Sequence, residues 1–137
     1  MDGVDAHFAV AGGNVCAVAQ RRGIAAFVVA GVIRDLAEVR QSGFPVFARG
    51  VMPIPGGKDQ IHALNAPVRC GGVTVHAGDI VVADGEGIVV VPRAREAADL
   101  KGAQTRAAKD AAESLDAWEA AHHAKIEEIL RRKGFGA

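Results

Sequence analysis

Arginine and aspartate stand side by side as Arg34 and Asp35, directly after an apolar run at residues 24–33. The guanidinium group of Arg34 is a planar fork of N–H donors that suits a carboxylate. The apolar run has the composition of a strand covered on both faces, and parallel sheets bind ligands at the carboxyl ends of their strands. The position of Arg34 therefore indicates a binding site for a small carboxylate.

Asp35 has two interpretations that the sequence leaves open. Placed before a helix, with Glu38 three positions later, it matches a variant of the capping box, in which side chains satisfy backbone N–H groups of the first helical turn. Alternatively, its carboxylate points outward and holds a ligand beside Arg34. A carboxylate at a helix start can do both, so we expect Asp35 to cap its helix and also to offer an oxygen to a ligand.

A glycine pair precedes an earlier helix in the segment AGGN, residues 11–14, here called the glycine loop. The bare backbone N–H groups of such a loop can converge on an anion at the positive end of the helix. An ordinary turn from loop to helix is the alternative. Because the glycine loop and Arg34 both lie at helix starts that flank one strand, we expect them to face a common pocket that fits a small carboxylate.

Several classes of function are disfavoured by composition and motifs. Sixteen basic residues balance sixteen acidic ones, which gives no indication of a nucleic-acid or membrane partner. The sequence contains no P-loop, no G-x-S-x-G elbow and no G-x-G-x-x-G fingerprint. These absences disfavour nucleotide hydrolysis, serine esterase chemistry and a Rossmann methyltransferase, respectively. The histidines lack zinc-binding spacing, so packing or solvated roles are expected for His62, His76, His122 and His123.

The expected location is the cytoplasm. No signal peptide and no apolar stretch of about 20 residues is present, which predicts a soluble protein. Cys16 and Cys70 form no C-x-x-C pair, so we expect two buried thiols in a reducing compartment.

The residues of the candidate site must be positioned by an α/β unit. Helical spacing begins at Asn14, a candidate N-cap, and Gly23 suits a left-handed stop. A buried strand at residues 24–33, a helix that ends at Gly43 and a strand at residues 44–49 follow. A helix between two strands predicts a parallel pair joined by a right-handed crossover.

The remainder of the chain is expected to form short strands and then helices. Four strands at close spacing, residues 67–70, 73–75, 80–84 and 88–92, predict a β-meander or small barrel-like layer. Asp79 and Asp84 lie beside glycines and are interpreted as turn formers. From Arg93 the chain reads as helical, and Ser114 can cap a helix whose apolar stripe comprises Leu115, Trp118, Ala121, Ile126, Ile129 and Leu130.

Two segments, GGNVCAVAQRRGIAAFVVAGVIRDLAEVRQSGFPVFARG and PVRCGGVTVHAGDIVVADGEGIVVVP, carry a recognisable pattern. The chain resembles the family of the regulator of ribonuclease activity A (RraA), which includes the class II 4-hydroxy-4-methyl-2-oxoglutarate aldolases. The similarity runs from about Val4 to Pro92. Its most specific elements are the Arg34–Asp35 pair, here called the R-D pair, the segment G-x-PVFAR and the segment GDIVVAD-x-x-G.

The resemblance implies an α/β fold of the swivelling β/β/α type, with residues 1–92 as the RraA-like core and 93–137 as a C-terminal helical extension. It also implies homotrimers or hexamers with sites at subunit interfaces. Arg34 would bind substrate, and Asp35 would ligate a divalent metal, Mg²⁺ or Mn²⁺. The keto-acid carboxylate would be bound by backbone amides of the glycine loop, at Gly12, Gly13, Asn14 and Val15.

The implied activity is a metal-dependent lyase that cleaves a small 2-keto acid to pyruvate, by retro-aldol cleavage of 4-hydroxy-4-methyl-2-oxoglutarate or by decarboxylation of oxaloacetate. The alternative is a non-catalytic RraA-like protein that binds and regulates a protein partner such as a ribonuclease. The R-D pair favours the enzyme.

Two departures from the family pattern favour the alternative. The aldolases carry an acidic residue in the glycine loop where this chain has Gly13, and the chain starts partway into the family pattern. The aldolases also take an acidic residue from the C-terminal helical region of a neighbouring subunit. Asp110 and Glu113 are candidates for that residue, and a solvated helix face is the other interpretation of both.

Overall fold

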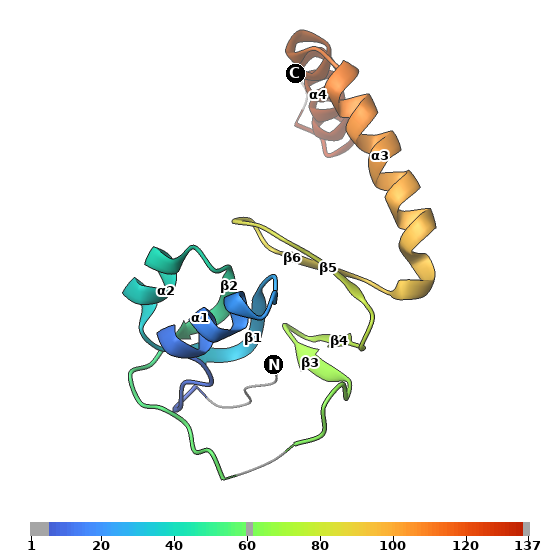
Figure 1. Ribbon diagram of the computed structural model, residues 1–137. Helices are drawn as coiled ribbons and strands as arrows, with labels where there is room; N and C mark the ends of the chain where they lie inside the picture. The colour runs from blue at the N-terminus through green and yellow to red at the C-terminus, as the bar shows by residue number, and fades with distance from the viewer. Residues whose placement is uncertain (1–5, 60–61, 136–137) are drawn as a thin grey trace. The chain divides into compact units, whose positions relative to one another are not determined.

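The computed structural model describes residues 6–59 and 62–135, and its site-bearing part is a parallel strand–helix–strand unit (Figure 1). Strand β1 (Phe27–Ile33) and strand β2 (Val46–Val51) are parallel, and α2 (Leu36–Ser42) connects them. Gly43 ends α2 in the left-handed conformation, with φ of 69°, which glycine adopts without steric cost. The predicted parallel arrangement is therefore confirmed.

The segment before α1 (Gly13–Arg21) runs beside β1. Ala9 forms a parallel bridge with Val32, and the N–H of Arg34 donates to the carbonyl of Ala11 at 2.9 Å. These bonds fix the glycine loop at the carboxyl end of β1. Gly23, with φ of 76°, follows the end of α1 as expected.

The predicted N-cap of α1 is wrong. The helix begins one residue earlier, at Gly13, with Gly12 as the N-cap and no side-chain cap. Asn14 therefore lies inside the first turn, where its side chain cannot act as the cap.

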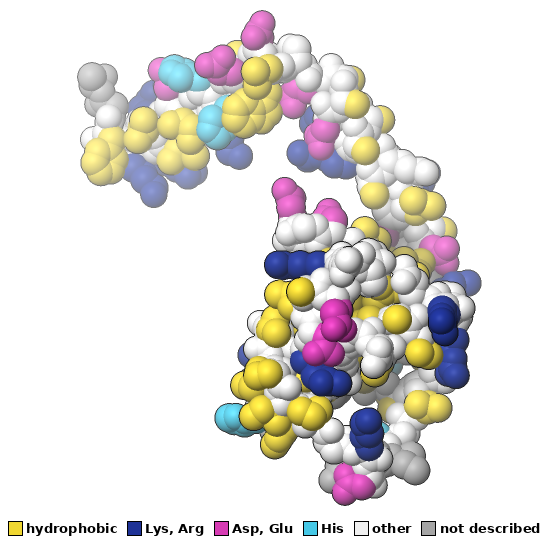
Figure 2. Space-filling model, turned by 60° about the vertical axis from the view of Figure 1, so that its left-hand side comes forward, with side chains coloured by type: hydrophobic (Ala, Val, Ile, Leu, Met, Phe, Trp, Pro, Cys, Tyr) yellow, Lys and Arg dark blue, Asp and Glu magenta, His cyan; other side chains and the backbone are white. Residues whose placement is uncertain are grey.

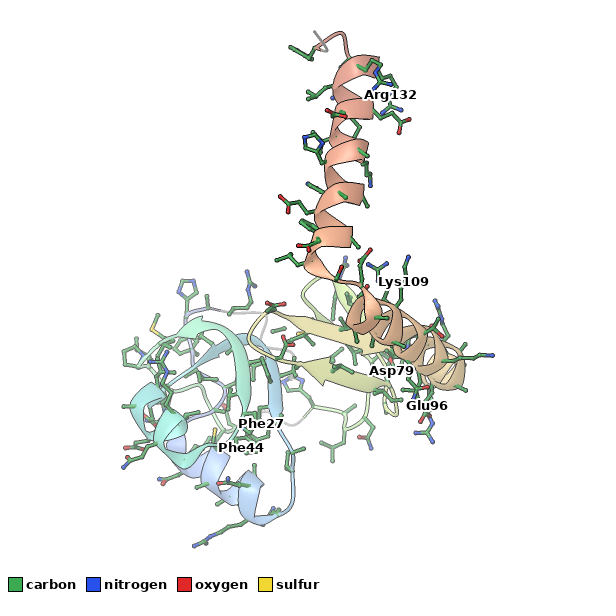
Figure 3. The ribbon with its side chains drawn as sticks, turned by 90° about the horizontal axis from the view of Figure 1, so that it is seen from above. Phe27, Phe44, Asp79, Glu96, Lys109 and Arg132 are labelled. Atoms are coloured by element: carbon green, nitrogen blue, oxygen red, sulfur yellow. The ribbon has the colours of Figure 1, made fainter. Side chains whose placement is uncertain are left out.

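The core lies between α1, α2 and the parallel strands. Buried Cys16, Ala19, Val39 and Phe44 form one cluster, and Ala11, Val29 and Ile33 form another. Phe27 packs against both clusters and meets Phe44 edge to face, with ring centroids 5.0 Å apart (Figure 3). Within residues 6–59 and 62–135, all the buried hydrophobic residues lie between Ala9 and Phe44, so the packing is concentrated under the candidate site.

The four short strands form two separate antiparallel hairpins. Strand β3 (Val68–Cys70) pairs with β4 (Val73–Val75), and β5 (Ile80–Ala83) pairs with β6 (Ile88–Val91). No ladder joins the two hairpins within residues 62–135, so the prediction of one continuous meander is wrong there, although its strands are present. A link of two residues in the first hairpin and of four residues in the second fixes the pairing within each hairpin, whereas pairing between hairpins depends on tertiary packing.

Both turn aspartates are confirmed. Asp79 Oδ2 accepts from the backbone N–H of His76 at 2.8 Å, and Asp84 Oδ1 accepts from that of Glu86 at 2.8 Å. These contacts are local side-chain turns of the kind that short carboxylates form.

Residues from Ala94 onward form a second compact unit. After a short 3₁₀ turn (Arg93–Arg95) come α3 (Glu96–Ala112) and α4 (Leu115–Arg132). Ser114 caps α4 as predicted, because its hydroxyl accepts from the N–H of Ala117 at 3.2 Å.

Within its own unit, no residue of the apolar stripe of α4 is fully buried. Figure 2 shows yellow apolar side chains on the surface of this unit, and Leu115 is 76% exposed. No helix in the described part of the chain is both long and apolar enough to cross a membrane.

Candidate active site

Asp35 and the glycine loop are joined by a direct hydrogen bond. The backbone N–H of Gly13 donates to Asp35 Oδ2 at 3.1 Å. Asp35 occupies the N-cap position of α2, but its side chain makes no capping bond there. The predicted capping role of Asp35 is therefore wrong, and its carboxylate serves α1 instead of its own helix.

The backbone of Asp35 explains this difference. Its φ of 56° and ψ of 42° are left-handed, whereas a capping residue is normally extended. The left-handed backbone conformation costs a non-glycine residue about 1–3 kcal/mol of folding free energy, and residues in this conformation concentrate at functional sites. The left-handed turn directs the carboxylate away from the first turn of α2 and toward Gly13.

Arg34 lies beside this carboxylate with its side chain partly in solvent. Its Nε is 3.6 Å from Asp35 Oδ2, and the Arg34 side chain is 41% exposed. Because an exposed pair at this distance stabilises the fold by little, the guanidinium group retains donors for a ligand.

Gly12 is buried under the R-D pair. A Cβ atom at position 12 would overlap Asp35 Oδ2 and would lie 2.8 Å from Arg34 Cγ. The glycine is needed here for close approach, since its extended φ of −144° is open to any residue. The predicted association of the glycine loop with the R-D pair is thus present as a single packed surface.

The amides of the glycine loop have different partners. The N–H of Gly13 is directed to Asp35, so in this structure it is engaged by the protein. The N–H groups of Asn14 and Val15 donate no hydrogen bond to any described residue, and both residues are exposed. The amides of Asn14 and Val15 are therefore open at the positive end of α1.

Cys16 lies beneath the site and is completely buried. Burial, and to a smaller extent the negative charge of Asp35, raises the pKa of the Cys16 thiol. Cys70 is only half-buried in β3, so the expectation of two buried thiols holds for Cys16 alone.

The donor set for a metal consists of a single carboxylate. No group of three His, Cys, Asp or Glu side chains lies together among residues 6–59 and 62–135. The contacts of Asp35 both use Oδ2, and Oδ1 accepts no hydrogen bond within this part of the chain. One free carboxylate oxygen suits Mg²⁺, which keeps several waters and is often held by one or two carboxylates together with substrate.

Glu38, which the sequence indicates only as a capping partner of Asp35, reaches the glycine loop. A Cβ atom at Gly13 would overlap Glu38 Oε2 and would lie 3.1 Å from Glu38 Cβ. The available signal was its spacing from Asp35, because residues three apart share one face of a helix.

The two candidate acidic residues of the helical unit lie at the end of α3. Asp110 Oδ1 pairs with Arg106 Nε at 2.9 Å on α3, and Glu113 is the C-cap residue of the same helix.

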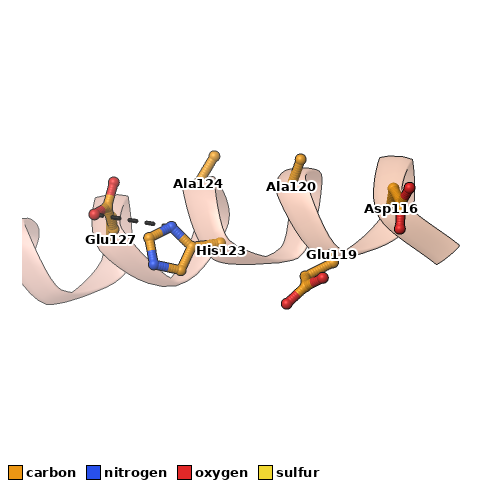
Figure 4. Close-up of a pocket in the computed structure, with 6 residues that line it drawn as sticks. All are labelled: Asp116, Glu119, Ala120, His123, Ala124 and Glu127. Atoms are coloured by element: carbon orange, nitrogen blue, oxygen red, sulfur yellow. Dashed lines mark ion pairs between the residues drawn. The ribbon is translucent and has the colours of Figure 1, made fainter.

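On α4, His123 Nδ1 lies 3.8 Å from Glu127 Oε1 (Figure 4). A shallow hollow there is lined by Asp116, Glu119, Ala120, His123, Ala124 and Glu127. All six belong to one helix, so the hollow is open surface.

The fold and the packed site define a recognised class. The chain belongs to the RraA-like family, described as Aldolase/RraA, whose model matches residues 1–90.

Its relatives carry different names. The chain is 39% identical, over 104 residues, to a Halalkalibacterium halodurans protein named "Putative 4-hydroxy-4-methyl-2-oxoglutarate aldolase". This match covers 76% of the chain and 50% of that relative, so the chain spans about half the length of the protein it matches.

Two solved structures share the fold. One is Streptomyces coelicolor RraAS2, described as an unusual member of the RNase ES inhibitor RraA protein family, with 30% identity and a TM-score of 0.68. That match covers 88% of this chain and 58% of the other. The second, described as an S-adenosylmethionine: 2-dimethylmenaquinone methyltransferase from Geobacillus kaustophilus, has 33% identity and a TM-score of 0.63 over 66% of this chain and 56% of that one. Because one fold carries three names, function must be argued from the site.

Proposed function

We propose that this chain carries the site of a divalent-metal-dependent lyase that cleaves a small 2-keto acid to pyruvate. The observation that carries the proposal is the hydrogen bond from Gly13 to Asp35, which joins the glycine loop and the R-D pair into one surface. A partly exposed guanidinium group, a partly exposed carboxylate and two open amides face solvent at this surface. The aldolase name of the relative from Halalkalibacterium halodurans supports the same class.

Substrate binding is assigned to positively polarised groups. Arg34 binds a substrate carboxylate through its guanidinium fork, and the open amides of Asn14 and Val15 bind an anionic oxygen at the start of α1. The amide of Gly13 has a different task, because its bond to Asp35 fixes the orientation of that carboxylate.

Asp35 would hold Mg²⁺ or Mn²⁺ through Oδ1, the carboxylate oxygen that accepts no bond from the described protein. A divalent cation supplies Lewis-acid polarisation of the keto oxygen and stabilises the negative charge that develops as the carbon–carbon bond breaks.

Both candidate reactions have balanced steps. In 4-hydroxy-4-methyl-2-oxoglutarate, loss of the C4 hydroxyl proton forms the C4 carbonyl as the C3–C4 bond breaks. The bonding electrons remain on C3, so one product is pyruvate and the other is the pyruvate enolate, which gains a proton at C3. Oxaloacetate loses carbon dioxide and leaves the same enolate, so one site can serve both substrates.

We also propose that the protein acts in the cytoplasm as a homotrimer or hexamer. Exposed apolar side chains on the β5–β6 hairpin support assembly, since Val82 is 60% and Val89 is 61% exposed. Asp110 and Glu113 remain candidates for a role across a subunit interface.

The second candidate function is binding and regulation of a protein partner such as a ribonuclease. It is favoured by the likeness to Streptomyces coelicolor RraAS2, which is described as a member of an RNase inhibitor family. The absence of an acidic residue from the glycine loop favours the same alternative.

The test is pyruvate release, coupled to lactate dehydrogenase, from 4-hydroxy-4-methyl-2-oxoglutarate and from oxaloacetate. Release with Mg²⁺ or Mn²⁺ that is abolished by EDTA supports the lyase. Folded protein that releases no pyruvate above background contradicts it and favours the regulatory function, which binding to a purified ribonuclease would then test.

A further inference from the structure

Asp79 belongs to the GDIVVAD-x-x-G segment and precedes β5 at the open end of the β5–β6 hairpin (Figure 3). The N–H of Asp79 donates to the carbonyl of His76 at 3.1 Å, and Asp79 Oδ2 accepts from the N–H of His76 at 2.8 Å. Gly78, with φ of 93°, supplies the left-handed residue inside this turn. The two reciprocal bonds fix the orientation of the Asp79 carboxylate.

The other oxygen of this carboxylate reaches a residue far along the chain. Asp79 Oδ1 accepts from the backbone N–H of Arg93 at 3.3 Å, 14 positions later. The hairpin ladder ends at the pair Ile80–Val91, and the next residue, Pro92, has no N–H with which to continue it. The side chain of Asp79 therefore binds the chain where backbone pairing between β5 and β6 has stopped.

The bond from Arg93 lies at the boundary between the two compact units. Arg93 is the last residue of the first unit, and Ala94 begins the helical unit, so the boundary Arg93–Ala94 is here called the junction. Both Asp79 and Arg93 lie in the first unit, and their bond attaches the last residue of that unit to the turn before β5. Asp84, at the closed end of the hairpin, makes local bonds instead, since its Oδ1 accepts from N–H groups two and three positions away.

We infer that the Asp79 carboxylate is a latch on the junction. When the latch is closed, the N–H of Arg93 is bound and the chain leaves the hairpin from a fixed point. When it opens, residues 93–95 separate from the turn before β5, while β5 and β6 stay paired through their own backbone bonds. Opening is a local event that costs less free energy than unfolding of the hairpin. This inference is independent of the proposed lyase function.

Trypsin measures opening of the junction, because Arg93 and Arg95 are exposed cleavage sites within it. Where opening and closing are fast relative to cleavage, the cleavage rate follows the population of the open form. Asp79→Ala removes both acceptor oxygens, so cleavage after Arg93 and Arg95 is expected to become about fivefold faster, the size of effect that loss of one hydrogen bond produces. Mass spectrometry identifies the cut, and hydrogen exchange of the Arg93 amide is expected to accelerate by a similar factor.

The matched control is Asp84→Ala, which removes another carboxylate that accepts from two N–H groups in a turn of the same hairpin. Its cleavage rate after Arg93 and Arg95 is expected to equal that of the wild type. If Asp84→Ala accelerates this cleavage as much as Asp79→Ala does, general loosening of the hairpin explains the effect and the latch is overturned. Wild-type rates of cleavage and exchange in Asp79→Ala would overturn it as well.

Asp79→Ser tests the latch if Asp79→Ala fails to fold. The serine hydroxyl can still accept from the N–H of His76 and form the turn, but it provides no second oxygen for Arg93. We expect faster cleavage after Arg93 in Asp79→Ser than in Asp84→Ala, compared at the same distance from their urea midpoints of unfolding. Equal cleavage rates in this comparison would assign Asp79 to turn formation alone and overturn the latch.

Discussion

The backbone N–H of Gly13 donates a 3.1 Å hydrogen bond to Asp35 Oδ2, although the two residues are 22 positions apart. This bond joins the starts of α1 and α2 at the carboxyl end of β1. It fixes the orientation of one carboxylate oxygen and leaves the other without a hydrogen bond from any described residue.

Asp35→Asn should separate catalysis from folding. Asparagine tolerates the left-handed backbone and retains an oxygen that can accept from Gly13, but it removes the negative charge. We expect loss of metal-dependent pyruvate release, with a free energy of unfolding within about 1 kcal/mol of the wild type. Coupled assays and urea denaturation measure the two effects.

Asp35→Ala is the companion variant. It loses the acceptor as well, so it should cost about 1–3 kcal/mol of unfolding free energy in addition to activity. Metal-dependent turnover that persists in Asp35→Asn would contradict a metal-binding role for this residue.

Arg34→Lys should weaken substrate binding. Lysine keeps the charge but loses the planar fork, so we expect KM to rise about tenfold, equivalent to about 1.4 kcal/mol, with a smaller change in kcat. Arg40→Lys is the control, because Arg40 is exposed on α2 and lies outside the R-D pair. Unchanged kinetics in Arg34→Lys would argue against carboxylate binding by this residue.

Gly12→Ala should destabilise the protein because the added methyl group overlaps the R-D pair. Overpacking of this kind costs about 1–3 kcal/mol. Gly85→Ala is the control, since nothing lies within 4 Å of a Cβ atom at Gly85, and its effect should be within about 0.5 kcal/mol. Equal urea midpoints for the two variants would be inconsistent with the close approach at Gly12.

Cys16 should resist thiol reagents while Cys70 reacts. Burial, with a smaller effect of Asp35, raises the pKa of the Cys16 thiol, and the reactive species is the thiolate. We expect one fast and one slow thiol in native protein, with Cys70→Ser removing the fast one.

The same shift predicts how stability depends on pH. The folded state holds the Cys16 proton more tightly than the unfolded state. The protonated thiol therefore contributes to the free energy of unfolding, and this contribution is fully present below the ordinary thiol pKa. It is lost as the pH rises through the raised pKa of the folded state. Urea midpoints in wild type and Cys16→Ala across alkaline pH measure this difference, and parallel curves would contradict it.

Local patterns were sufficient for most of the secondary structure. The apolar run before Arg34 predicted β1, glycines predicted the ends of α1 and α2, and Ser114 predicted the start of α4. These features depend on neighbours in sequence, through backbone conformation and side-chain capping.

Predictions that depended on side-chain direction were less reliable. Asn14 and Asp35 were both expected to cap helices, and neither does. The left-handed φ of Asp35 is held by packing around α1 and α2, which local propensity does not specify.

The sequence by itself determined the family and its parallel α/β unit, because motif spacing and hydrophobic periodicity depend only on the order of residues along the chain. Only the tertiary structure decided which groups meet at the glycine loop. The Asp35 carboxylate bonds to Gly13, and Glu38 fills the space in front of it. The physical reason is that this contact depends on how two helices pack at the end of one strand, and crossover geometry brings together groups that are distant in sequence.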